Sequence, residues 1–326
     1  MQKYDKYIEA AYSRFEKWKA DDDCVVFPMI TDLHSALVTE DALNGQRRDT
    51  LSHIRILNAA AERFSADFTA NLGDFGVDVP VKDPLNIEQL CSRLFEYHAS
   101  SKVKPVLYAP GNHDITRGVA PESLHRGFQE INTGCNIFSP AGKLYGYYDI
   151  PAKKCRVFYL FCNETADYYS DEQFAFIEAN LISMPSGWSA AFIQHKCILR
   201  RGRWQHDQFD PLPENFVKLH ELFAKFVRNG GKIAGVFSGD SHFNLFEKAD
   251  GVNYYSSQGY GGIGPSEAPA HALLFHEFCP ALNRTDTFNA ATCCLIDVAA
   301  VKTQKQEIAV FRIGAGDKEF DITETY

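Results

Sequence analysis

The sequence lacks the features that would mark a membrane protein or a disulfide-stabilised protein. No apolar run reaches the roughly 18 residues that a membrane-spanning helix requires. Charges interrupt residues 1–23 throughout, so we expect no signal peptide there. The nine cysteines include no C-x-x-C pair, and several of them lie in apolar, strand-like runs. We therefore expect buried free thiols in the reducing cytoplasm rather than a disulfide framework.

Basic residues are also in short supply, with 33 Lys and Arg against 42 Asp and Glu and a net charge of −9. Proteins that coat nucleic acid or an anionic membrane present a broad basic face, so we expect neither as a partner. A small anionic substrate is compatible with this balance. The stretch RRGRWQHD (200–207) fits a solvated loop better than a nucleotide site. GYGGIGP (259–265) does not follow the pattern G-x-G-x-x-G into a helix, which excludes a dinucleotide cradle there.

The composition is that of an ordinary globular protein, with 45% hydrophobic residues in a chain of 326. Segments with helical spacing alternate with short apolar runs up to residue 240, which predicts an α/β fold, and short strands follow. We expect one domain over 1–326, with an N-terminal helical segment at about 1–22 and inserts at about 115–150 and 259–290. The predicted helices are 4–19, 49–66, 86–97, 171–181 (with Ser170 and Gln173 as a capping box) and 214–231, and the predicted strands are 24–30, 67–72, 104–110, 156–162, 189–194, 232–238, 242–247, 252–257, 292–298 and 307–313.

Metal-binding residue types follow five of these strands, at the point where each strand ends. Because ligands bind at the carboxyl ends of the strands in α/β sheets, we expect the five clusters to converge. Two dications roughly 3.5–4 Å apart need a bridging oxygen ligand and a mixed shell of imidazole, carboxylate and amide groups. The sequence therefore predicts a two-metal site. The clusters contain Asp32 with His34, Asp74, Asn112 with His113 and Asp114, His195, and Asp240 with His242.

Local spacing supports this interpretation. Asp32 and His34 point the same way on an extended segment, so they can chelate one ion. A glycine before Asp74 and another before Asn112 let the backbone turn sharply and come close to the ions. Taken singly, each cluster also has a structural interpretation, such as a helix cap at Asp32. Five clusters in order, each at a strand end, favour the metal site.

In this order the clusters resemble the signature of the calcineurin-like metallophosphoesterases: D-x-H, G-D, G-N-H-[DE], a lone H and G-H-x-H. The resemblance covers residues 24 to about 256. It implies the family's four-layer α/β/β/α sandwich with two mixed sheets, two divalent metal ions as cofactors, and a hydroxide held between them as the nucleophile.

The resemblance also implies a role for each matching residue. His113 is the imidazole that faces the phosphate as an acid, and Asp114 orients it. The neighbours of His195, in the stretch QHKC, carry no further signature. The implied metal ligands are Asp32, His34 and His242 on the first ion, Asn112, His195 and Asp240 on the second, and Asp74 as the bridge.

Asp240 departs from the pattern, because the family usually has histidine there. A carboxylate still ligates a dication, but it lowers the formal charge of the two-metal site from +2 to +1. It also favours Mn²⁺, Fe²⁺ or Mg²⁺ over Zn²⁺ at the second site. The alternative is that Asp240 lies behind the ligands and touches no ion.

These residues together predict a metal-dependent phosphoesterase. The sequence has GDFGVDVP and GNHD where the protein Ser/Thr phosphatases have G-D-x-V-D-R-G and G-N-H-E. We therefore expect small phosphodiesters of nucleotide or cyclic-nucleotide type as substrates. Two alternatives stay open: a phosphomonoesterase or protein phosphatase of the same fold, and a non-catalytic binding protein with an impaired second metal site. Arg117 is a candidate phosphate contact, whereas His271 and His276 are assigned no role.

Overall fold

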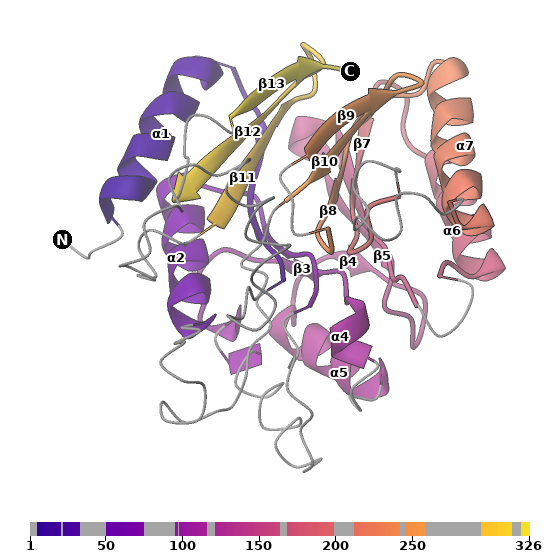
Figure 1. Ribbon diagram of the computed structural model, residues 1–326, viewed down its shortest axis with the longest axis horizontal. Helices are drawn as coiled ribbons and strands as arrows, with labels where there is room; N and C mark the ends of the chain where they lie inside the picture. Colours follow the sequence, from indigo (N-terminus) through magenta and orange to yellow (C-terminus); the bar gives the residue numbers. More distant parts are fainter. Residues whose placement is uncertain are drawn as a thin grey trace, which may run out of the picture.

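Two mixed β-sheets make up the centre of the protein, and helices cover their outer faces (Figure 1). Most strands are short apolar runs that are buried on both faces, as expected for strands covered by helices on one side and by a second sheet on the other. The computed structural model describes residues 5–20, 22–32, 50–74, 95–96, 98–115, 121–163, 168–198, 212–241, 245–257, 295–314 and 321–326.

The first sheet contains three parallel strands, β1 (Val25–Ile30), β2 (Thr69–Asn71) and β3 (Val106–Tyr108). Three antiparallel strands complete it, β11 (Leu295–Lys302), β12 (Glu307–Gly314) and β13 (Ile322–Thr325). The strand order is β13-β12-β11-β1-β2-β3. Because β1, β2 and β3 are parallel neighbours, the segments that follow them leave the sheet at the same edge.

The second sheet contains four parallel strands, β6 (Cys155–Tyr159), β7 (Ser189–Ile193), β8 (Ile233–Ser238) and β10 (Val252–Ser256). The antiparallel strands β4 (Ile137–Phe138) and β5 (Gly146–Ile150) extend one edge, and β9 (Leu245–Ala249) extends the other. The order is β4-β5-β6-β7-β8-β10-β9. Here β7 and β8 are neighbours, so the residues that follow them come close together.

The helices lie on two sides of the pair of sheets (Figure 1). Helices α1 (Asp5–Lys19) and α2 (Thr50–Arg63) pack on the first sheet, and α6 (Asp171–Ile182) and α7 (Glu214–Arg228) cover the second. Among the described residues, no helix is long and apolar enough to cross a membrane. Shorter helical segments in the described part of the chain include α4 (Asn112–Ile115), α5 (Pro121–Ile131) and the 3-10 turn η1 (Pro151–Lys153).

Aromatic side chains join the layers. Phe27 of β1 and Phe237 of β8 pack edge to face between the two sheets, with ring centroids 5.1 Å apart. On the outer side of the second sheet, Phe192 of β7 contacts Phe223 of α7 at 4.3 Å. Helix α1 packs against β12 on the outer side of the first sheet. The order of layers is therefore helix, sheet, sheet, helix, which confirms the predicted α/β/β/α sandwich.

The predicted strands, from 24–30 to 307–313, correspond to β1–β3 and β6–β12, and four of the five predicted helices correspond to α1, α2, α6 and α7. The predicted helix 86–97 lies mostly outside the described residues, and the predicted insert 259–290 lies entirely outside them. Residues 121–150 of the other predicted insert form α5, β4 and β5, and the two strands extend the second sheet.

The start of α6 differs in one detail from the predicted capping box. The Ser170 hydroxyl accepts a hydrogen bond from the Gln173 backbone N–H at 3.2 Å, as predicted. The Gln173 side chain instead bonds to the backbone N–H and C=O of Phe161, at 2.9 and 2.8 Å. Because Phe161 follows β6, Gln173 ties the helix to the end of that strand, and the reciprocal half of the capping box does not form.

Candidate metal centre

The loops after β1, β2, β7 and β8 are joined by backbone hydrogen bonds. The Asp32 N–H donates to Gly73 O at 2.9 Å, which joins the loops after β1 and β2. The Gly239 N–H donates to His195 O at 2.9 Å, which joins the loops after β8 and β7. The two pairs meet where the Asp240 N–H donates to Asp32 Oδ2 at 3.1 Å. The predicted clusters therefore converge across both sheets.

Three of the predicted ligands share an unusual backbone conformation. Asp32, Asp74 and Asp240 all lie in the left-handed region, with φ of 54°, 52° and 64°. Aspartate tolerates this region better than most residues because its short polar side chain can bond locally. Strain of this kind costs about 1–3 kcal/mol per residue and is concentrated at functional sites. The surrounding hydrogen bonds hold the three carboxylates in place against it.

Two glycines allow the loops after β2 and β3 to touch. Gly73 has φ of +95°, and a Cβ atom there would lie 2.5 Å from Gly111 N. A Cβ atom on Gly111 would lie 2.1 Å from Asp74 Oδ1. Neither position has room for a side chain. The glycines thus bring the backbone before Asp74 against the backbone before Asn112.

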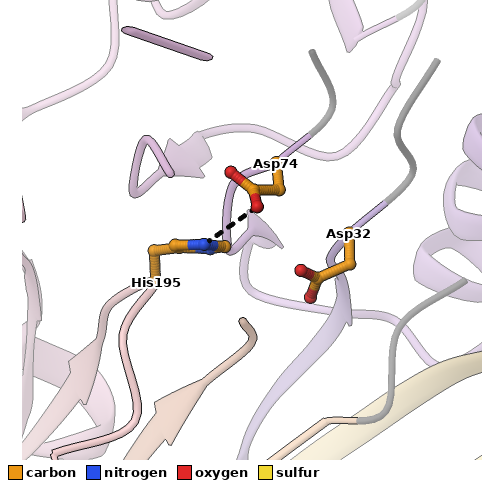
Figure 2. A group of neighbouring side chains, drawn as sticks. All are labelled: Asp32, Asp74 and His195. Carbon is orange, nitrogen blue, oxygen red and sulfur yellow. Dashed lines mark ion pairs between the residues drawn. The ribbon is translucent and has the colours of Figure 1, made fainter. Parts of the chain in front are cut away.

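His195 presents a fixed nitrogen to the centre. Its ring is fully buried, and Nδ1 donates to the Leu72 carbonyl oxygen at 2.7 Å. A histidine that uses one nitrogen in this way offers the lone pair of the other to a metal ion. Nε2 faces three side-chain oxygens. The dashed line in Figure 2 marks its ion pair with Asp74. The three oxygens are Asp74 Oδ2 and Asn112 Oδ1, each at 3.2 Å, and Asp240 Oδ1 at 3.5 Å.

A neutral His195 would turn the lone pair of its Nε2 toward the lone pairs of these three oxygens. A proton or a metal ion between them removes that repulsion. Burial lowers the pKa of His195, while the carboxylates of Asp74 and Asp240 raise it by more, so the net pKa lies well above the ordinary value. The same negative potential attracts a divalent cation. Donor atoms that share one ion at about 2.0–2.2 Å lie about 3.0–3.5 Å apart. The residues present therefore fit a divalent metal ion.

Asp32 lies on the other side of Asp74 from His195 in the view of Figure 2, and its carboxylate points into the same space. It is fully buried, and Oδ2 accepts a hydrogen bond from the Thr31 hydroxyl at 2.6 Å. One ligand atom each from Asp32, Asp74 and His195 lie within 4.8 Å of one another. His34 and His242, the other predicted ligands of the first ion, lie outside the described residues, so that half of the shell stays a prediction.

His113 stands in helix α4 at the rim of the centre. Its backbone N–H donates to Asp74 Oδ1 at 2.9 Å, and its Nε2 lies 3.9 Å from Asp74 Oδ2. The side chain is 24% exposed, whereas that of Asp74 is 3% exposed. His113 can therefore be reached from solvent while it stays beside the ligands, as a proton donor to a bound ester requires.

Asp114 joins the loops that contain Gly73 and Gly111. Its Oδ2 accepts hydrogen bonds from Asp74 N at 2.9 Å, Gly111 N at 2.8 Å and the Tyr108 hydroxyl at 2.7 Å. Burial, with the nearby charge of Asp74, raises the pKa of the Asp114 carboxyl to about 6. The contacts show that Asp114 holds the loop that carries Asp74. Its predicted role in orienting His113 stays a prediction.

Sequence reasoning missed two groups beside the centre. The sequence pattern predicts no role for Lys196, yet its Nζ donates to Asp240 Oδ1 at 2.5 Å. Its position next to His195 is the available signal. Asn71, at the end of β2, accepts a hydrogen bond from Gly73 N at 3.0 Å and donates to His98 Nε2 at 3.0 Å. Its amide thus braces the turn before Asp74. Arg117, the stretch 200–207, His271 and His276 lie outside the described residues.

The fold and the donor set define the class of this protein: an α/β/β/α sandwich with carboxylate, amide and imidazole groups for metal at the carboxyl ends of its parallel strands. The chain belongs to the calcineurin-like phosphoesterase family, whose model matches residues 29–244. That range contains every predicted ligand together with His113 and Asp114. The identification made from the sequence is confirmed.

Solved structures share this fold at low sequence identity. A dimetal phosphatase from Danio rerio matches with a TM-score of 0.63 and 13% identity, over 93% of this chain and 99% of that one. A putative 5′-nucleotidase from Staphylococcus aureus matches with 0.50 and 12%, over 93% and 53%, so this chain spans about half its length. GAP50, the anchor in the inner membrane complex of Plasmodium, matches with 0.50 and 11%, over 93% and 89%. No curated protein matches the chain in sequence.

Proposed function

We propose that the protein is a dinuclear-metal-dependent phosphoesterase that hydrolyses small phosphodiesters of the nucleotide or cyclic-nucleotide type. The environment of His195 carries the proposal, because its Nε2 faces three side-chain oxygens that a divalent cation would satisfy. Membership of the calcineurin-like phosphoesterase family supports the reaction class. The Danio rerio protein of the same fold is a dimetal phosphatase, which is compatible with two ions here.

When bound, divalent metal ions would activate water and neutralise negative charge on the phosphoryl group. The chain supplies their ligands on a rigid frame, since the loops that carry them are joined by hydrogen bonds. Most of the donors are oxygens, which favours Mn²⁺, Fe²⁺ or Mg²⁺ over Zn²⁺. The residues that would hold the ions are Asp74, Asn112, His195 and Asp240 for one, and Asp32, His34 and His242, with Asp74 shared, for the other.

His113 would give a proton to the leaving oxygen. Its position at the rim leaves its imidazole accessible to a substrate bound beside Asp74, and its backbone bond to Asp74 fixes the distance between the two. General acid catalysis contributes about 10²–10⁴-fold, most for esters with poor leaving groups. A protein that only bound phosphate would have no need of this group.

The preference for a diester rests on the sequence. The stretch GDFGVDVP lacks the arginine of the protein Ser/Thr phosphatase motif. A phosphomonoesterase is the second candidate, and Lys196 is the observation that favours it. Its ammonium group adds positive charge beside Asp240, and a more positive centre attracts a dianionic monoester more than a monoanionic diester.

The test measures kcat/KM of the Mn²⁺-loaded protein on bis-p-nitrophenyl phosphate, p-nitrophenyl phosphate and a panel of cyclic nucleotides. We expect the diesters to be preferred, EDTA to abolish activity and Mn²⁺ to restore it. His195→Ala should abolish turnover. The matched control is His220→Ala, because His220 of α7 bonds to Tyr254 and Asp250 and lies outside the centre; it should keep its activity.

The rival functions give different results in the same assay. Higher kcat/KM for the monoester would favour the second candidate. Protein that binds two Mn²⁺ ions but turns over none of these substrates would contradict the enzyme and favour the non-catalytic binding protein.

A further inference from the structure

An ion pair between Lys196 and Asp240 lies inside the candidate centre. Lys196 Nζ donates to Asp240 Oδ1 at 2.5 Å, and the same oxygen lies 3.5 Å from His195 Nε2. The side chains of Lys196 and Asp240 are only 11% and 16% exposed, so little solvent screens the pair. The charge of Lys196 therefore acts directly on the residue that stands where the family usually has histidine.

The fold places these two residues opposite each other. Lys196 follows β7 and Asp240 follows β8, which is the parallel neighbour of β7. The Gly239 N–H donates to His195 O at 2.9 Å, and the fully buried Gln194 side chain donates to Lys196 O at 2.8 Å. The backbone is thus fixed on both sides, and the ion pair is part of the packed structure.

The pair also accounts for a charged carboxylate at a position that is only 16% exposed. A carboxylate with so little solvent around it is unfavourable unless a positive charge lies beside it. Lys196 is thus the compensating charge that the aspartate requires.

We propose that Lys196 compensates for aspartate in place of histidine at position 240, and so sets the affinity of the centre for its second metal ion. The inference rests on the proposed dinuclear function. An aspartate and a lysine together carry no net charge, as a neutral histidine does. The pair therefore restores the formal charge that the centre would have with histidine at 240, which the carboxylate alone would lower by one unit. Lys196 acts through Asp240 and is a positioning residue.

The test is a double-mutant cycle of Lys196→Met and Asp240→His, with Mn²⁺ affinity measured by titration calorimetry. Lys196→Met removes a cation beside the second ion and releases Asp240, so the second Mn²⁺ should bind more tightly. Asp240→His leaves the ammonium uncompensated, so the second Mn²⁺ should bind more weakly. The double variant carries no net charge at this pair, as in the wild type, so the two effects should offset and the Mn²⁺ affinity should return toward the wild-type value. Each single change should shift the affinity of the second site on the order of tenfold. A lysine with a merely structural role would not produce tighter binding when it is removed.

Lys153→Met is the matched control. Lys153 pairs with Asp67 at 2.8 Å, and the two residues precede β6 and β2, at the ends of the strands away from the centre. This control should leave Mn²⁺ affinity unchanged. Lys196→Arg, which keeps the charge, should bind Mn²⁺ like the wild type.

The outcomes separate this inference from the proposed function. Wild-type protein that binds fewer than two Mn²⁺ ions contradicts the dinuclear centre, and the compensation falls with it. Two ions in the wild type, with a second Mn²⁺ affinity that Lys196→Met leaves unchanged or lowers, contradict only the compensation. If the double variant does not fold, urea unfolding in EDTA decides: Lys196→Met should be less stable than the wild type, and equal stability with unchanged Mn²⁺ affinity overturns the inference.

Discussion

Replacing Gly111 with alanine tests how closely the loop after β3 packs against Asp74. An added Cβ atom would lie 2.1 Å from Asp74 Oδ1 and 2.8 Å from its Cγ, whereas ordinary contacts begin at 3.4 Å. The carboxylate must therefore move by about an ångström, well beyond the roughly 0.2 Å tolerance of a metal–ligand distance. We expect Gly111→Ala to weaken metal binding by about 100-fold, the upper end of the effect of disturbing groups that support ligands.

The expected change in unfolding free energy has two parts. Overpacking costs about 1–3 kcal/mol whether or not metal is present. Metal linkage adds a second part: Mn²⁺ at about 100 times the wild-type Kd stabilises the wild type by about 2.7 kcal/mol, but a variant with 100-fold weaker binding by only about 0.4 kcal/mol. The Mn²⁺-dependent part thus separates displacement of Asp74 from general damage to the core.

Urea unfolding with Mn²⁺ and with EDTA, followed by circular dichroism, measures both parts. Gly134→Ala is the control, because Gly134 has φ of +84° and no atom of the described residues lies within 4 Å of an added Cβ. It should lose about 1 kcal/mol from backbone strain and keep the full Mn²⁺-dependent gain. An undiminished gain in Gly111→Ala would refute the packing argument.

Three further predictions test other parts of the site. His113→Ala should lower kcat by about 10²–10⁴-fold on an ester with a poor leaving group while bound Mn²⁺ stays constant; unchanged turnover would exclude His113 as the acid. Asp114→Ala should cost about 3 kcal/mol or more in urea unfolding, because buried donors lose their acceptor; a cost under about 1 kcal/mol would contradict this. Burial, with Lys104, lowers the pKa of His98 to about 4. His98 takes up a proton near pH 6.5 in the unfolded chain but only near pH 4 in the folded protein. The free energy of unfolding should therefore fall by up to about 3 kcal/mol between pH 6.5 and 4 in EDTA. A slope that His98→Gln does not flatten would rule out His98 as the cause.

The convergence of the site could be predicted from the sequence because it follows from a general rule of parallel sheets. Asp74, Asn112 and His195 each follow a short apolar strand, and neighbouring parallel strands end at one edge. The apolar runs also determined most of the strands, since β1, β2, β3, β6, β7, β8 and β10 are buried along their whole length. Helix α7 could be predicted because its buried apolar residues recur at helical spacing over 15 residues.

The partners of the ligands could not be predicted in this way. Lys196 and Asp240 are 44 residues apart, and their contact depends on β7 and β8 being neighbours and on how two loops turn. The left-handed backbone at Asp32 and Asp74 leaves no local signal, because the residue is not glycine. Strand β4 is only two residues long, too short for any periodicity, and β5 is a strand because β6 offers it an edge. These features arise from tertiary contacts.

The most direct test of the dinuclear centre is anomalous diffraction at the manganese edge from crystals soaked in Mn²⁺. A dinuclear centre should give two anomalous peaks about 3.5–4 Å apart, one of them within about 2.0–2.3 Å of His195 Nε2 and in contact with Asp240, with Asp74 between the two. A single peak, no peak, or peaks that leave His195 Nε2 without a metal would contradict it.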